Sequence, residues 1–185
     1  MVEIKGSTIR DAVAAYQEHL ADELLRVLAR LDPSTRELFQ DRIAPNAWFP
    51  LDALVCYLEA QLVESGAPAE MLIARTEVVT ERQLNGIDRI FARLLSPASV
   101  VGRIAAINAT YFRGVEVERR SSSDHGAVLL YVGFEPRHEL MGYIIIGFYR
   151  KTLEVCGARS VRADWTTPIS AGAGYAELTI GWEDA

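Results

Sequence analysis

The spacing of hydrophobic and polar positions changes near residue 114. Before that point, apolar residues recur three or four positions apart, as they do in helices with one buried face. After it, residues 115–118 and 161–165 alternate apolar with polar side chains, which is typical of strands. The pattern predicts one domain, residues 1–185, with a helical half over 1–113 and a sheet-containing half over 114–185.

The first part of the helical half reads as three helices, with a loop before the third. Apolar positions from Ile9 to Leu31 keep the 3–4 spacing, which predicts one long first helix. A capping box that begins at Ser34 predicts a short second helix. Residues 44–49 read as a loop, and Pro50 suits the first position of a third helix that ends near residue 64.

The rest of the helical half contains two more helices with a break between them. Pro68 predicts a helix start, and a second capping box at Thr80 predicts a break near that residue. Ser96 followed by Pro97 predicts a capped helix that reaches about residue 113 and is ended by Gly114.

The second half reads as strand, strand, helix, strand, strand. The first pair flanks a turn over residues 121–126, and the second pair flanks a turn over residues 169–174. Two hairpins on either side of one helix predict a four-stranded antiparallel sheet with that helix on one face. The predicted class is α+β, with the helical half packed on this sheet.

The helix between the hairpins carries an unusual apolar run from Leu140 to Tyr149, LMGYIIIGFY. A surface helix shows one apolar stripe, whereas this run is apolar on nearly every side. It is too short to span a bilayer, which takes about twenty residues. We therefore expect this helix to be buried, next to a pocket or at a self-association face.

Composition and charge narrow the classes of function. The chain is 50% hydrophobic with a net charge of −6, so nucleic-acid binding, which needs a basic face, is not expected. The N-terminus lacks the apolar core of a signal peptide, and the cytoplasm is the expected location. Cys56 and Cys156 are then expected to be free thiols.

The sequence offers no set of residues suited to catalysis, to a metal or to a phosphate. Ser121 to His125 contain the residue types of a hydrolase triad, but consecutive residues in a polar run are typical of a hairpin turn. His19 is expected to be solvated, and His138 is expected to take part in capping. No phosphate-binding glycine motif or metal-ligand spacing is present, so we predict no catalytic residue, no metal and no cofactor.

Aromatic residues gather in the segments that flank the apolar helix and within it. Packing in the core explains any one of them, but together they favour an apolar cavity for a flat ligand. Arg113 and Arg150 are the nearest candidates for a polar anchor, although surface exposure is favoured for each. The candidate ligand-binding residues are Trp48, Tyr111, Arg113, Tyr143, Phe148, Tyr149 and Trp165.

Several short motifs carry a resemblance to a known superfamily. They are Ile4-Lys5-Gly6, Ala47-Trp48-Phe49-Pro50, Leu95-Ser96-Pro97, Tyr111-Phe112-Arg113-Gly114 and the closing Gly157…Ala173-Gly174-Tyr175…Gly181-Trp182. With the order of elements, the chain resembles the superfamily of 4-vinyl-reductase-type domains, haem nitric-oxide-binding domains and TRAPP core subunits. It is most similar to a bacterial, myxobacterial-type branch. The resemblance covers nearly the whole chain and implies an α+β domain with a pocket between helices and sheet.

The chain departs from this superfamily at positions that matter for chemistry. Haem-binding members carry Tyr-x-Ser-x-Arg, and none of the seven tyrosines here begins that pattern. Vinyl-reductase-type members place cysteines around the final hairpin, which has none here. In TRAPP-like members a cysteine can carry an acyl chain, and Cys56 is a position for comparison without a matching motif.

Two hypotheses from different classes follow. The first is a non-enzymatic cytoplasmic sensor that binds a small apolar or aromatic molecule between helices and sheet. The second is a protein-interaction or homodimerisation module with a filled core, in which the apolar run forms the interface. An enzyme ranks third, because no acid–base pair or activated nucleophile stands at a suitable spacing.

Overall fold

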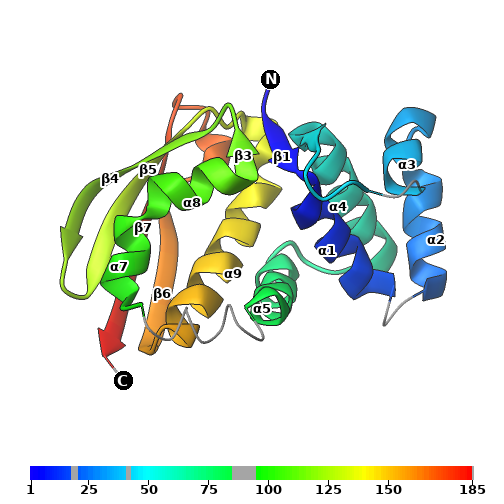
Figure 1. Ribbon diagram of the computed structural model, residues 1–185. Coiled ribbons are helices and arrows are strands. Elements are labelled where there is room, and N and C mark those ends of the chain that lie inside the picture. The colour runs from blue at the N-terminus through cyan, green and yellow to red at the C-terminus, as the bar shows by residue number, and fades with distance from the viewer. Residues whose placement is uncertain (18–20, 41–42, 85–94, 185) are drawn as a thin grey trace.

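The computed structural model describes residues 1–17, 21–40, 43–84 and 95–184, with helices on one side of the molecule and a sheet on the other (Figure 1). The predicted α+β class is confirmed. The helices are α1 (Gly6–Gln17), α2 (Ala21–Arg30), α3 (Pro33–Gln40), α4 (Leu51–Ser65), α5 (Met71–Gln83), α7 (Pro97–Gly102), α8 (Ile104–Tyr111) and α9 (Leu140–Val155), with two 3-10 turns, η1 (Pro136–His138) and η2 (Ile169–Ala171). The strands are β1 (Glu3–Lys5), β2 (Trp48–Pro50), β3 (Phe112–Arg113), β4 (Glu116–Ser123), β5 (Gly126–Val132), β6 (Ala158–Thr167) and β7 (Ala176–Asp184).

The larger sheet has the predicted order of elements. Its four strands are antiparallel and adjacent in the order β4-β5-β7-β6, with α9 between the two hairpins in sequence. The first turn is shorter than predicted, because Ser122 and Ser123 are still paired with β5 and only Asp124 and His125 cross between the strands. The polar run is therefore part of a hairpin, as expected.

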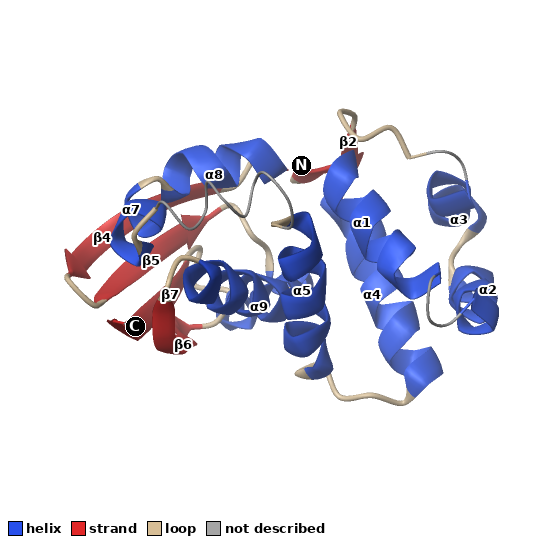
Figure 2. Ribbon diagram, turned by 60° about the horizontal axis from the view of Figure 1, so that its bottom comes forward, coloured by secondary structure: helices blue, strands red, loops and turns tan. Residues whose placement is uncertain are grey.

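The helix α9 packs on one face of this sheet (Figure 2). Inward-facing strand residues such as Leu129, Leu178 and Ala163 are fully buried, whereas Glu118 and Thr179 on the opposite face are exposed. Every residue of α9 from 140 to 149 is buried or half-buried. The predicted burial of the apolar run is confirmed, and its own chain covers it.

The N-terminal helices differ from the prediction. Instead of one helix from Ile9 to Leu31, the structure has two separate helices, α1 and α2, that lie beside one another. Residues 18–20, with His19, lie outside the described residues. The cap of α3 is also two residues earlier than predicted, because Asp32 Oδ1 accepts the backbone N–H groups of Ser34 and Thr35 at 3.0 and 3.1 Å. A carboxylate at this position satisfies N–H groups that have no partner within the helix.

The next helices correct the predictions for Pro68 and Thr80. Helix α5 begins at Met71, and the predicted break near Thr80 is wrong because α5 continues to Gln83 with Thr80 buried. The cap at Ser96 is confirmed, since its side chain accepts the Ser99 N–H at 3.2 Å. The predicted single helix beyond it is two short helices, α7 and α8, and the chain becomes extended at β3 before Gly114.

A second, three-stranded sheet was not predicted. Strand β1 lies between β2 and β3, and Ile4 is opposite both Phe49 and Phe112. The residues expected to form a loop before Pro50 thus end in strand β2, and Pro50 precedes α4 rather than beginning it. This small sheet pairs the start of the chain with β2 and β3, which lie far along the sequence, and it places the first turn of α1 beside the larger core.

Candidate functional site

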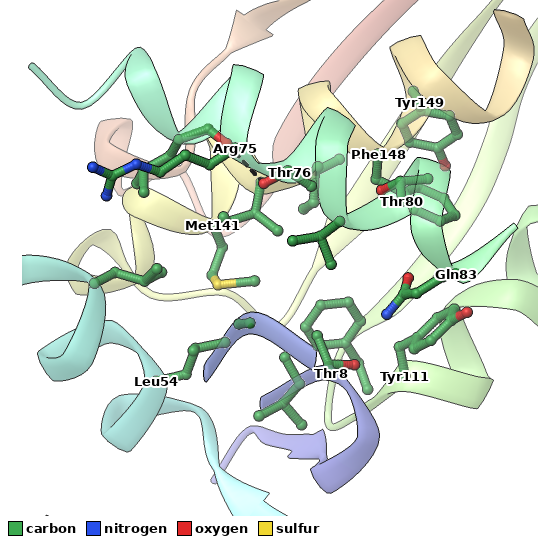
Figure 3. A pocket seen from close by; sticks show the side chains of 18 of the residues that line it. Thr8, Leu54, Arg75, Thr76, Thr80, Gln83, Tyr111, Met141, Phe148 and Tyr149 are labelled. Carbon is green, nitrogen blue, oxygen red and sulfur yellow. Dashed lines mark hydrogen bonds between the residues drawn. The ribbon is translucent and has the colours of Figure 1, made fainter. Parts of the chain in front are cut away.

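A cavity of about 330 Å³ lies between the two halves of the molecule. Its walls come from α1, α4, α5, α8 and α9, with β1, β3 and the end of β5 closing it (Figure 3). The volume falls in the range of about 300–1,000 Å³ that small-molecule sites occupy. Its lining is mostly aliphatic and aromatic, and includes Ile4, Ala12, Leu54, Leu58, Leu72, Val79, Ile104, Ile107, Met141, Ile144 and Ile145.

The position of the α5 wall depends on a glycine in α9. A Cβ at Gly147 would lie 2.5 Å from the carbonyl oxygen of Ile73 and 2.9 Å from Cβ of Thr76. Only a residue without a side chain lets the two helix backbones approach this closely. Thr76 is itself satisfied, since its hydroxyl donates to the Leu72 carbonyl at 2.7 Å (Figure 3). The α5–α9 contact therefore fixes one side of the cavity.

The opposite wall combines α1 and α4. Leu54 and Leu58 of α4 are buried and face the cavity, and Gln61 one turn on is also buried. Gln61 Oε1 lies 3.5 Å from Nη1 of Arg75, which reaches across from α5. Thr8 of α1 contributes a hydroxyl that is buried and has no hydrogen-bond partner in the described part of the chain.

Aromatic rings form the wall nearest the sheet. Tyr111 lies edge-on to Phe148 at a centroid distance of 6.2 Å, and Phe148 lies edge-on to Tyr149 at 5.6 Å. Tyr149 in turn shares a hydrogen bond with Tyr131 of β5, with the two hydroxyl oxygens 3.0 Å apart. All four residues line the cavity, so a flat molecule there would meet a continuous aromatic surface.

Three of the seven residues predicted to bind a ligand line this cavity: Tyr111, Phe148 and Tyr149. The Trp165 indole lies instead between sheet and helix, where its Nε1–H donates to the Gly142 carbonyl at 3.1 Å. Tyr143 is half-buried on α9 and lies outside the lining.

The remaining two predicted residues come together at another place. The guanidinium carbon of Arg113 on β3 lies 4.2 Å from the ring centroid of Trp48 on β2. This is a cation–π contact across the small sheet, and neither residue lines the cavity. Arg113 is thus a neighbour of Trp48 and not an anchor for the pocket predicted beside the apolar helix.

Tyr131 and Thr8 line the cavity but were not among the predicted residues. Tyr131 occupies an inward position of the alternating strand before Gly133, so its direction could have been read from that alternation. No pattern in the sequence marked Thr8 as a cavity residue, because a threonine in the first turn of a helix commonly serves only as a cap.

His138 has a structural role at the start of α9. It forms a capping box with Glu135, as expected from the sequence, and its Nδ1 accepts the Glu135 backbone N–H at 3.0 Å. The neutral ring therefore carries its proton on Nε2, which donates to Asp52 Oδ1 of α4 at 3.0 Å. Both ring nitrogens are used, and the imidazole joins α4 to the entry of α9.

The cysteines also lie apart from the cavity. Cys56 is exposed on α4, and Cys156 is buried after α9, where burial raises the pKa of its thiol. A raised pKa disfavours the thiolate needed for nucleophilic or ligand chemistry. Within the described residues no three His, Cys, Asp or Glu side chains stand close enough to hold a metal ion, and no helix is long and apolar enough to cross a bilayer.

Comparison with solved structures identifies the fold. The chain is similar to an Fe(II) unliganded H-NOX protein from K. algicida, with a TM-score of 0.75, 9% identity and 98% and 97% of the two chains covered. It is also similar to an H-NOX protein from S. oneidensis in the Fe(II)NO ligation state (TM-score 0.72, 12% identity, 97% and 99% covered). An oxygen-binding H-NOX domain related to soluble guanylate cyclases gives a TM-score of 0.68 at 10% identity, with 97% and 95% covered. The predicted likeness to haem nitric-oxide-binding domains is confirmed as a likeness of fold.

Comparison by sequence adds nothing to this. No protein-family model matches the chain, and no curated protein matches it. The fold is therefore shared with H-NOX domains at a level of identity where the residues of a site need not be retained.

The residues that line the cavity do not fit a haem. Haem iron is held by an imidazole, a thiolate, a phenolate or a methionine–histidine pair. Among the described residues, no histidine or cysteine lines the cavity, and both nitrogens of His138 are engaged elsewhere. Of the three tyrosines in the lining, Tyr131 and Tyr149 are paired with each other, and burial raises the pKa of each, which disfavours the phenolate, while the Tyr111 ring packs edge-on against Phe148. Met141 offers a lone thioether.

Proposed function

We propose that this chain is a single-domain, non-enzymatic cytoplasmic sensor or regulatory module that binds a small apolar or aromatic molecule in the cavity. The observation that carries the proposal is the cavity itself, with its volume of about 330 Å³ and its aliphatic and aromatic lining. The fold shared with H-NOX domains supports a sensor, and the misfit to haem favours an organic ligand over an iron porphyrin.

The chemistry of the walls selects against charged ligands. A charged group placed among Leu54, Ile104 and Ile145, away from the two arginines that α5 contributes to the lining, would lose its hydration without compensation. An apolar molecule gains about 25 cal/mol for each Å² that it removes from water. Binding should therefore increase with the apolar surface of the ligand until the cavity is full.

Ligand binding in the cavity can be transmitted to a partner protein, because the cavity walls belong to different parts of the fold. A ligand would touch α1 and α4 on one side and α8 and α9 on the other, with α5 between them. Val78 of α5 both lines the cavity and is exposed, so α5 borders the way in. A ligand that favours one position of α5 over another would shift the population of states that a partner protein reads.

The test is a fluorescence titration with N-phenyl-1-naphthylamine, an uncharged dye that brightens in apolar surroundings. The wild-type chain should give a saturable increase at one site per chain. The variant Ala12→Phe fills the cavity from α1 and should weaken binding about tenfold or more, since repacking costs about 1–3 kcal/mol.

Ala14→Phe provides the matched control. Ala14 lies on the same helix but is exposed and outside the lining, so the same substitution there should leave dye binding unchanged. Equal binding by wild type and Ala12→Phe, or no saturable binding by folded wild type, would exclude the cavity as the site.

A further inference from the structure

The pair of buried hydroxyls on the cavity wall is the feature that packing does not explain. Tyr131 on β5 and Tyr149 on α9 are 2% and 1% exposed, and their oxygens are 3.0 Å apart. Both line the cavity, and Figure 3 shows Tyr149 among the labelled residues that surround it. Phenylalanine would supply the same aromatic surface without bringing a polar group into the core.

The Tyr131–Tyr149 pair carries one O–H proton more than its hydrogen bond uses. Two phenols carry two O–H protons, and the single hydrogen bond between them uses one. Within the described part of the chain, the second proton has no acceptor. A buried donor left without an acceptor costs about 1–3 kcal/mol, so a partner for this proton would stabilise the folded chain.

Two side-chain amides that line the cavity already donate elsewhere, whereas the Thr8 hydroxyl on the α1 wall has no partner in the described part of the chain. The Asn108 amide donates to the Val115 carbonyl at 2.8 Å, and the Gln83 amide donates to Asp11 at 2.7 Å. Burial raises the pKa of Tyr131 and of Tyr149, so both phenols keep their protons at neutral pH. The spare proton therefore stays on the pair, where an acceptor in the cavity could receive it.

We infer that the ligand is a neutral, largely apolar molecule that carries one hydrogen-bond acceptor, such as a ketone or quinone oxygen, and sets it against the Tyr131–Tyr149 pair. This inference rests on the proposed function and specifies the ligand class. A ketone oxygen accepts the spare proton and brings no charge into the apolar walls, whereas a carboxylate would bring one. The Tyr111 and Phe148 rings beside the pair suit an aromatic ketone.

A matched set of three probes tests the inference: fluorene, 9-fluorenone and fluorene-9-carboxylate. Fluorene and fluorenone share one tricyclic shape and differ in the acceptor oxygen, and the carboxylate adds a charge. Wild type should bind fluorenone about tenfold more tightly than fluorene, because a buried unpaired donor gains a partner. It should bind the carboxylate most weakly of the three.

The double variant Tyr131→Phe/Tyr149→Phe removes both hydroxyls and should abolish the preference for fluorenone. Tyr143→Phe changes a tyrosine on the same helix outside the cavity lining and should retain that preference. The infrared carbonyl stretch of fluorenone bound to wild type gives a readout without any variant. It should lie at lower frequency than in an apolar solvent, as for a carbonyl that accepts a hydrogen bond.

The outcomes separate the inference from the proposed function. Equal binding of fluorene and fluorenone by wild type, or an unshifted carbonyl stretch, would overturn the role of the tyrosine pair while the cavity remains a binding site. Preference for the carboxylate would overturn it as well, in favour of the arginines that α5 brings to the cavity, Arg75 and Arg82. Failure of folded wild type to bind any of the probes, or the naphthylamine dye, would count against the cavity itself.

Discussion

Two buried polar groups on the segment that contains α9 differ in whether all their hydrogen-bonding groups have partners. The His138 imidazole, 1% exposed, has a partner for each ring nitrogen. Tyr149 is equally buried farther along the same segment, yet it and Tyr131 hold one proton more than their single hydrogen bond uses. Buried polar groups are nearly always satisfied in folded proteins, so an exception on a cavity wall supports the inferred ligand. Under the proposed function, this difference distinguishes a junction that stabilises the fold from a cavity wall that binds a ligand.

The largest expected effect comes from breaking the satisfied junction. His138→Ala removes both hydrogen bonds and the buried ring, and should lower the free energy of unfolding by about 2–4 kcal/mol. Urea unfolding followed by circular dichroism measures this. Asp52→Asn keeps an oxygen that can accept from Nε2 and should cost far less than Asp52→Ala. Wild-type stability in His138→Ala would show that the junction contributes nothing.

Opening the α5–α9 contact should have the next largest effect. In Gly147→Ala the new Cβ would meet the Ile73 carbonyl at 2.5 Å, so α5 must move, at a cost of about 1–3 kcal/mol. The shifted wall should also weaken dye binding. Gly102→Ala places a Cβ in another helix, 3.5 Å from the Arg119 side chain, and should leave both properties unchanged. Unchanged stability and dye binding in Gly147→Ala would refute the close contact.

Because the Tyr131–Tyr149 pair is buried, we expect the folded chain to lose stability at high pH. Burial raises the pKa of both phenols in the folded chain, while unfolded tyrosines titrate near about 10. The unfolded chain therefore releases protons that the folded chain retains. The contribution is fully present below about pH 9 and should fall by about 0.8 kcal/mol for the pair on reaching about pH 10.

Unfolding free energies of wild type and the double phenylalanine variant between about pH 8 and pH 10 measure this difference. Parallel profiles for the two proteins would mean that the tyrosines are not buried as neutral phenols.

The smallest expected effect sharpens the contrast with His138. Tyr131→Phe/Tyr149→Phe removes two hydroxyls together and leaves no buried donor behind, so stability at neutral pH should change by less than about 1 kcal/mol. Chemical unfolding at pH 7 measures it. A loss comparable to that of His138→Ala would mean that the pair is a satisfied structural network and not a binding group.

The sequence predicted the sheet half more completely than the helical half. Alternation fixes which strand residues face inward, and the single all-round apolar run could be covered only from several sides, so the order of elements along the chain and the burial of α9 followed. In the helical half, apolar spacing continues across the boundary between α1 and α2 and so cannot reveal it. The capping-box pattern that begins at Thr80 occurs by chance in the sequence of α5, which continues through it.

The candidate site was predicted only in part, for a related reason. Aromatic residues on α8 and α9 were found because they accompany the apolar run, and Tyr111, Phe148 and Tyr149 do line the cavity. Trp48 and Arg113 lie together because they belong to strands β2 and β3 of the small sheet. These strands have three and two residues, which is too few to show an alternating pattern in the sequence. The spare proton of the tyrosine pair depends on a contact between β5 and α9 that no local pattern encodes.

A methyl-resolved NMR titration with 9-fluorenone tests the central claim most directly. The account predicts saturable shifts, and nuclear Overhauser contacts to the probe, at the cavity methyls of Leu54, Leu72 and Ile145. Leu25 and Val63, which are 68% and 62% exposed, should not respond. Shifts confined to such surface methyls, or no saturable shift at the cavity methyls of the folded chain, would contradict a ligand site between the helices and the sheet.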